Sequence, residues 1–212
     1  MRVLIILHFL AVRVEKYGEM LYSLNVGERT MMWMKRMPSE KKIRSVVKYD
    51  CDFLTVVEDD VLLPGGKEGK RVVVKHIGAA SVLPITKDND VILVRQHRYA
   101  TGGDTLEIPA GKKDYRDEDG IQCARRELEE ETGYTASVFE KLQDVYTAIG
   151  FSDERIEIFV ARDATRMNNP PEGDDDEYVE IVVMPLKKAI ELAKQGEIVD
   201  SKTALALLSV NV

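Results

Sequence analysis

The chain has 212 residues, 44% of them hydrophobic and 32% charged, which is the composition of a soluble globular protein with room for one domain and an appendage. Its 30 basic and 37 acidic side chains give a net charge of −7 without a long Lys/Arg cluster, so we expect no nucleic-acid partner. Its two cysteines, Cys51 and Cys123, are too far apart to indicate a zinc site or a disulfide framework, and they favour a reducing, cytoplasmic location.

The first residues form an apolar run, Val3 to Val12 in "MRVLIILHFLAV". This run is too short to span a bilayer, and the charged segment "RVEKYGE" follows it without a small-residue cleavage site. We therefore expect a strand or helix that packs on the rest of the protein, and no membrane attachment. Because Met37 opens the hydrophilic "MPSEKKI", residues 1–36 are either native or an extension added before a natural start.

Segments rich in β-branched residues begin at Phe53. The stretches "FLTVVEDDVLLP" and "KRVVVKHIGAASVLPI" flank "PGGKEG", whose proline and glycines predict a hairpin turn. A second hairpin is predicted where "AASVLPI" and "VILVRQ" flank the polar "TKDND", and the short strand "TLEIPAG" follows. The predicted organisation is an N-terminal extension at 1–44, a β-strand subdomain at 45–75 and a main domain at 76–212.

A helix is predicted between Asp119, which can cap its first turn, and Gly133, which suits the position after its last turn. Beyond it, "SVFEKLQDVY", "RIEIFVAR" and "YVEIVVMPL" alternate as strands do, and two more helices are predicted at "KKAIELAKQG" and from about Ser201. This order of strands, helix, strands and helices predicts an α/β or α+β fold with a mixed sheet flanked by helices.

The first predicted helix contains "RRELEEETGY", in which four glutamates occupy five positions. Helical spacing places Glu127, Glu130 and Glu131 on one side of the helix. An adjoining apolar stripe should dock the helix on the core, and it consists of Ile121, Ala124 and Leu128.

Two interpretations of this acidic face are open. In the first, it is a solvated surface on which Arg126 pairs with Glu130 and Arg125 with Glu129, although such pairs contribute only about 0.3–0.5 kcal/mol each. In the second, the carboxylates hold a hard cation such as Mg²⁺, which prefers oxygen ligands and relieves the repulsion among them. We interpret the nearby Cys123 as a small packing residue, because Mg²⁺ disfavours thiolates.

The segment from Gly111 to Tyr134 resembles the Nudix box, in which a glycine and a glutamate precede the pattern Arg-Glu-apolar-any-Glu-Glu-any-Gly-apolar. The second half is matched at every specified position, and Glu118 stands eight residues before Arg126. The loop before the helix is one residue longer than in the pattern, so the role of the first glutamate falls to Asp117 or Glu118. The resemblance implies a Nudix-type α/β/α sandwich with a mixed sheet, preceded here by an antiparallel β-hairpin subdomain.

The likeness extends to the ADP-ribose pyrophosphatase branch of the family through "VRQHRY", "LEIPAG", "GFSDERIEIF", "DDDEYVEIVVMPL" and "GEIVDSKTALALL". It implies a Mg²⁺-dependent hydrolase, with Mn²⁺ as a substitute, that splits ADP-ribose into AMP and ribose 5-phosphate. It also implies a homodimer built by the N-terminal strands. The metal ligands it implies are Ala110, Glu127, Glu130 and Glu131. The substrate-binding residues it implies are Arg95, Arg98 and Glu107. The catalytic residues it implies are Glu118, Arg126, Glu131 and Glu177.

The general base is expected in the acidic tip "DDDE", on a loop before a late strand. Glu177 is favoured, with Asp176 and Glu180 as alternatives, and a merely solvated loop remains the simpler interpretation.

The substrate is less closely indicated than the chemistry. Enzymes of the ADP-ribose branch tend to carry a proline in a Ser-Pro-Gly context beyond the box, and this chain has Ala148, Ile149 and Gly150 there. Hydrolysis of another nucleoside diphosphate derivative, such as a different sugar nucleotide or a dinucleotide, is therefore a second hypothesis. A non-catalytic nucleotide sensor is a third, although a pure binder has no need of crowded glutamates.

Overall fold

The structure is a computed structural model that describes residues 38–171 and 178–211. The chain divides into two units, Met1–Ser39 and Glu40–Val212, and all the elements below belong to the second. The N-terminal apolar run lies outside the described residues, as do Asp176 and Glu177 of the acidic loop. Among the described helices, none has both the length and the hydropathy that crossing a bilayer requires.

An antiparallel sheet of three strands, in the order β1-β2-β3, opens this unit. Its strands are β1 (Lys41–Asp50), β2 (Leu54–Leu62) and β3 (Glu68–His76). The predicted hairpin is confirmed, because β2 and β3 pair in register from Leu54 opposite His76 to Leu62 opposite Glu68. Gly66 in the connecting turn has φ 81°, a left-handed conformation that glycine adopts without strain.

A mixed sheet of seven strands forms the centre of the unit, with the path β12-β5-β4-β10-β9; β6 pairs with β5 and β7 with β4. Strands β4 and β10 run parallel, whereas β5 is antiparallel to β4, β6 and β12. The strands are β4 (Ala79–Ile85), β5 (Asp90–Arg98), β6 (Gly103–Glu107), β7 (Ala110–Lys112), β9 (Val138–Tyr146), β10 (Arg155–Arg162) and β12 (Val179–Pro185). A separate two-stranded pair joins β8 (Tyr134–Thr135) to β11 (Thr165–Arg166).

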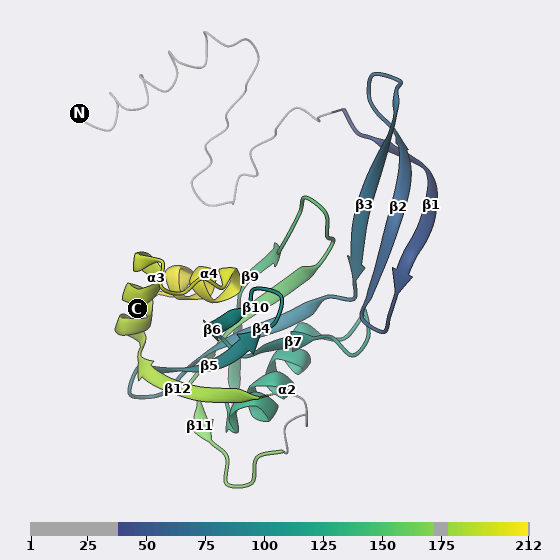
Figure 1. Cartoon of the computed structure of the whole chain (residues 1–212). Coiled ribbons are helices and arrows are strands. Elements are labelled where there is room, and N and C mark those ends of the chain that lie inside the picture. Colours follow the sequence, from purple (N-terminus) through teal and green to yellow (C-terminus); the bar gives the residue numbers. More distant parts are fainter. Residues whose placement is uncertain (1–37, 172–177, 212) are drawn as a thin grey trace, which may run out of the picture. The chain divides into compact units, whose positions relative to one another are not determined.

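Helices cover both faces of the mixed sheet, α2 (Gly120–Thr132) on one side and α3 (Leu186–Gln195) with α4 (Ser201–Ser209) on the other (Figure 1). Consecutive residues of β4 alternate between the two cores, since Val82 packs with Leu128 of α2 and Leu83 packs with Leu207 of α4. The predicted α/β/α sandwich with a mixed sheet is therefore confirmed.

Helix α2 has the predicted ends. The Asp119 carboxylate caps it by accepting a hydrogen bond of 2.9 Å from the N–H of Ile121, and Gly133 closes it at φ 66°. The predicted apolar stripe is partly wrong, because Ile121 is 38% exposed. Cys123 is buried in its place, beside Ala124 and Leu128, because the side of α2 that carries Cys123 packs against the sheet.

Candidate active site

The guanidinium of Arg126 lies among four carboxylates at the edge of α2. Its Nη1 lies 2.7 Å from Glu127 and 3.3 Å from Glu130. Its Nη2 lies 3.5 Å from Asp114 and 3.8 Å from Glu118. Burial opposes a charged guanidinium, but the negative charges of Glu127, Asp114 and Glu118 outweigh it and raise the pKa of Arg126. Arg126 therefore stays charged and neutralises part of a cluster that has more acidic than basic groups.

The acidic face is not a set of independent surface pairs. Arg126 does reach Glu130, but Arg125 donates instead to the carbonyl of Ala136 at 2.5 Å and lies over the Phe139 ring. Glu129 accepts a hydrogen bond of 2.7 Å from Thr135. The interpretation as a solvated face is therefore wrong for Arg125 and Glu129, which bind other partners. It is incomplete for Arg126 and Glu130, because Arg126 also contacts the other carboxylates of the cluster.

Strand β7 lies directly against two of the glutamates. The Ala110 N–H donates to Oε2 of Glu131 at 3.2 Å. A Cβ added at Gly111 would lie 2.1 Å from the carboxyl carbon of Glu127. A side chain at Gly111 would therefore displace the Glu127 carboxylate from this position, which accounts for a glycine here. Glu127 and Glu131 are 7% and 8% exposed, so both carboxylates are held at a buried junction between α2 and β7.

The other predicted box residue, Glu118, is also buried, and its Oε2 accepts a hydrogen bond of 2.8 Å from the Asp114 N–H. Asp117 is exposed. Of the two candidates for the first glutamate, the structure brings Glu118 into the cluster.

The donor chemistry of this junction suits a hard cation, since carboxylates and a backbone carbonyl are the available ligands. Within the described ranges, however, no three Asp, Glu, His or Cys side chains converge as ligands of one ion. The contacts explain this, because Glu127 and Glu130 turn to Arg126 and Glu131 turns to the Ala110 N–H. Cys123 adds no ligand, since burial and then the charges of Glu118 and Glu127 raise the pKa of its thiol to about 12.

A second ion-pair network surrounds Glu107 at the end of β6. Arg98 grips this carboxylate with two hydrogen bonds, from Nε at 2.7 Å and from Nη2 at 2.6 Å. Lys202 of α4 donates to it at 2.5 Å. Burial works to raise the pKa of Glu107, but the Arg98 hydrogen bonds and the Lys202 charge lower it to about 2. The predicted substrate residues Arg98 and Glu107 thus contact each other.

Two more of the predicted residues, Arg95 on β5 and Glu180 on β12, form an ion pair between neighbouring strands. Nη2 of Arg95 lies 2.5 Å from a carboxylate oxygen of Glu180 on β12, and both side chains are more than half exposed. They line a hollow of about 360 Å³ together with Tyr178 and His97. Because Arg95 and Arg98 are three positions apart on β5, their side chains leave opposite faces of the strand.

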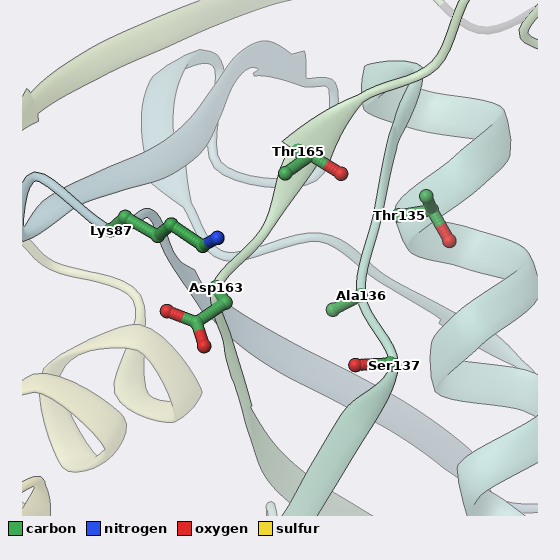
Figure 2. Close-up of a pocket in the computed structure, with 6 residues that line it drawn as sticks. All are labelled: Lys87, Thr135, Ala136, Ser137, Asp163 and Thr165. Carbon is green, nitrogen blue, oxygen red and sulfur yellow. The ribbon is translucent and has the colours of Figure 1, made fainter.

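A hollow of about 450 Å³ lies elsewhere, and none of its lining residues was predicted to belong to the site. Figure 2 shows Lys87 and Asp163 on one side of it and Ser137 on the other, near the pair β8–β11. Its size does not make it the active site, since the buried charges described above lie on other residues.

Sequence reasoning missed Asp114 and Lys202 as members of these networks. Asp114 lies in the loop that is one residue longer than the pattern, and only its position beside Arg126 reveals its part. Lys202 is 95 positions from Glu107 in sequence, so no local spacing connects them. Its available signal was the motif "GEIVDSKTALALL", where it stands two residues after Asp200, the residue that caps α4.

Residues 75–207 match the family model of the NUDIX domain, which covers more than half of the chain. The chain therefore belongs to the Nudix family, and the resemblance expected from the glutamate box is confirmed.

Two curated relatives and one solved structure show how much of the chain is shared. An ADP-ribose pyrophosphatase of Bacillus subtilis (strain 168) is 39% identical over 79% of this chain and 90% of its own length. A methanol dehydrogenase activator of Bacillus methanolicus is 37% identical over 82% of this chain and 94% of its own. The crystal structure of an ADP compounds hydrolase superposes with a TM-score of 0.70 at 23% identity, covering 82% of this chain and 94% of that one, which supports the fold.

Proposed function

We propose that this protein hydrolyses the pyrophosphate linkage of ADP-ribose, or of a closely related nucleoside diphosphate sugar, in a Mg²⁺-dependent reaction. The observation that carries the proposal is the buried junction of Glu127 and Glu131 with β7, in a chain 39% identical to an ADP-ribose pyrophosphatase over most of both lengths. The products would be AMP and ribose 5-phosphate.

Glu127, Glu130, Glu131 and the Ala110 carbonyl would hold Mg²⁺, which when bound neutralises phosphate charge and makes a water molecule more acidic. Arg126 bonds Glu127 and Glu130, which holds the two carboxylates in place and limits their repulsion. Glu118 fixes the loop before the helix through the Asp114 N–H. Arg98 would bind a phosphoryl oxygen of the substrate, a role that suits its fixed, half-exposed guanidinium.

Glu177 remains our proposed general base, with Asp176 as an alternative, although both lie outside the described residues. Glu180 is the weaker alternative, because its carboxylate is already engaged in an ion pair with Arg95.

We also propose a homodimer formed through the sheet β1-β2-β3. Strand β1 is almost wholly exposed and presents Ile43, Val47 and Tyr49, each more than half exposed, and Val72 of β3 is 56% exposed. Exposed apolar side chains on a sheet are typical of a protein interface. The division into an extension at 1–44, a dimerisation subdomain at 45–75 and a hydrolase domain at 76–212, in a cytoplasmic enzyme, stays part of this proposal.

Hydrolysis of ADP-ribose by the full chain, measured with Mg²⁺, with Mn²⁺ and with EDTA, tests the function. Activity should require the metal, and Glu131→Gln should lower kcat by about a hundredfold or more, because it removes a charged ligand and alters the junction with β7. Glu129→Gln is the matched control, since Glu129 bonds Thr135 instead, and it should stay near wild type.

A panel of other sugar nucleotides and dinucleotides identifies the preferred substrate. Faster turnover of another member would move the proposal to that compound. Tight nucleotide binding without turnover of any member would favour the sensor and refute the hydrolase.

A further inference from the structure

We propose that Lys202, at the start of α4, is a positioning residue that acts through Glu107 to hold Arg98 in the orientation that binds the substrate's phosphates. This inference deepens the proposed function and rests on it for the role of Arg98. The three side chains come from β5, β6 and α4, so the arrangement joins two paired strands of the mixed sheet to a helix formed much later in the chain.

Glu107 is fully occupied as a hydrogen-bond acceptor. Its Oε1 accepts from Nε of Arg98 at 2.7 Å and from the Thr105 hydroxyl at 2.5 Å. Its Oε2 accepts from Nη2 of Arg98 at 2.6 Å and from Nζ of Lys202 at 2.5 Å. The side chain is only 3% exposed, and a carboxylate offers about four lone-pair positions. These four hydrogen bonds occupy both carboxylate oxygens, so Glu107 cannot also bind substrate. Its effect on the reaction must therefore pass through Arg98 and Lys202, the two cations that it holds.

Arg98 keeps one edge of its guanidinium available. The bonds to Glu107 use Nε and Nη2, Nη1 makes no hydrogen bond to another of the described residues, and the side chain is 43% exposed. After Glu107, the carboxylates of Asp200 and Glu131 also contribute to the raised pKa of Arg98, so the guanidinium lies within electrostatic reach of the glutamate face of α2. The two hydrogen bonds along one edge fix the plane of the guanidinium. They thereby fix the direction from which its other edge can bind an oxyanion.

Lys202 and its neighbour connect α4 to the same short stretch of chain. Lys202 binds Glu107, and the hydroxyl of Thr203 accepts from the Ile108 N–H at 2.8 Å. Asp200 holds both α4 residues, lying 3.0 Å from Nζ of Lys202 and accepting from the Thr203 hydroxyl. Two consecutive residues of α4 thus hold the last residue of β6 and the residue after it, which fixes the position of the Glu107 carboxylate.

The charge of Lys202 is as important as its reach. The Lys202 side chain is 11% exposed, so a neutral replacement would leave Glu107 buried with Arg98 as its one cationic partner. The Glu107 carboxylate would then lose the contact with α4 that fixes its position, and Arg98, which is bound to it, would lose its fixed orientation. We expect Arg98 to bind the substrate's phosphates more weakly, and we expect the glutamate cluster around Arg126 to stay intact.

A double-mutant cycle tests this route. We would measure kcat and KM for ADP-ribose with Mg²⁺ in the wild type, Arg98→Met, Lys202→Met and the double variant. Lys202→Met should lower kcat/KM about tenfold, Arg98→Met should lower it further, and the double variant should match Arg98→Met within about twofold. Lys194→Met is the matched control, because Lys194 is an exposed lysine of α3. Lys202→Arg should recover most of the activity.

A second readout does not depend on turnover. The ¹⁵N NMR signal of the Arg98 Nε–H, assigned by its loss in Arg98→Met, should shift or broaden in Lys202→Met and stay unchanged in Lys194→Met. If Lys202→Met does not fold, Lys202→Gln, which keeps a donor for Glu107 without the charge, replaces it in both experiments.

The outcomes separate the two proposals. An unchanged Arg98 signal, or equal losses from Lys202→Met with and without Arg98, would overturn the role of Lys202. A wild type that turns over no nucleoside diphosphate sugar would overturn the proposed function, and the NMR signal would still decide whether Lys202 orients Arg98.

Discussion

The two ion-pair networks of this domain are arranged in opposite ways. On α2, one cation, Arg126, lies among the carboxylates of Asp114, Glu118, Glu127 and Glu130. At the end of β6, one carboxylate, Glu107, lies between two cations, Arg98 and Lys202. The first arrangement leaves acidic groups in excess, and the second turns the open edge of an arginine outward. The first network can therefore attract a cation and the second an anion, in neighbouring parts of one site, because neither network neutralises the other.

The largest expected effect comes from neutralising the centre of the second network. Glu107→Gln should destabilise the fold by about 3 kcal/mol, because it removes the buried carboxylate charge that Arg98 and Lys202 share. The folded pKa of Glu107 is about 2 against a usual 4.5, so this contribution is present above about pH 4.5 and is lost as the pH falls toward 2.

Urea unfolding at a series of pH values measures this difference. The gap between the variant and the wild type should be widest near neutral pH and should narrow below about pH 4.5. Glu140→Gln is the control, since Glu140 is largely exposed and its ion pair with Arg162 is long at 3.9 Å. A gap that does not change with pH would mean that Glu107 acts through its shape and not through its charge.

A smaller effect is expected from crowding the first network. Gly111→Ala places a methyl group where the Glu127 carboxylate lies, and this flexible side chain must move away from β7. We expect kcat/KM for ADP-ribose to fall about tenfold or more, with a change in stability of only about 1 kcal/mol. Gly65→Ala, in a turn where an added Cβ meets nothing, should leave both quantities unchanged. A large loss of stability with normal kinetics would contradict this account of Gly111.

The smallest effect concerns Cys123, whose thiol lies beside the negative charges of the first network. Although Nη2 of Arg126 lies 3.6 Å from its sulfur, Cys123 has a pKa of about 12, because burial and then the charges of Glu118 and Glu127 act against a thiolate. Titration with a thiol reagent near neutral pH should therefore modify Cys51, which is partly exposed, and should reach Cys123 only after unfolding. Equal rates for the two thiols would show that the cluster is more open or less acidic than described.

Local signals in the sequence predicted the parts of the site that depend on neighbours in the chain. The Asp119 cap, the Gly133 end and the shared face of the glutamates all follow from helical geometry, and α2 has each of them. The helical period wrongly predicts a buried Ile121, because the period alone does not fix which side of a helix meets the sheet. Strand β1 was not predicted, because "KKIRSVVKYD" mixes charged and apolar residues and is nearly all exposed.

Contacts between distant parts of the chain were beyond such signals. Nothing near Glu107 in sequence indicates that Lys202 donates to it, and nothing near Arg95 indicates Glu180. These pairs exist because β12 and α4 return to strands made much earlier in the chain. The resemblance to the family supplied residue types at these positions but not which of them meet.

The parallel pairing of β4 with β10, from Ala79 opposite Ile156 to Ile85 opposite Arg162, has a consequence for how the protein reaches its native state. These neighbours are far apart in sequence, so the central ladder cannot close until most of the domain has been synthesised, and such long-range topologies fold slowly. In the interval, the apolar residues of β4 and β5 that the folded domain buries are exposed, and such exposure favours aggregation of newly made chains.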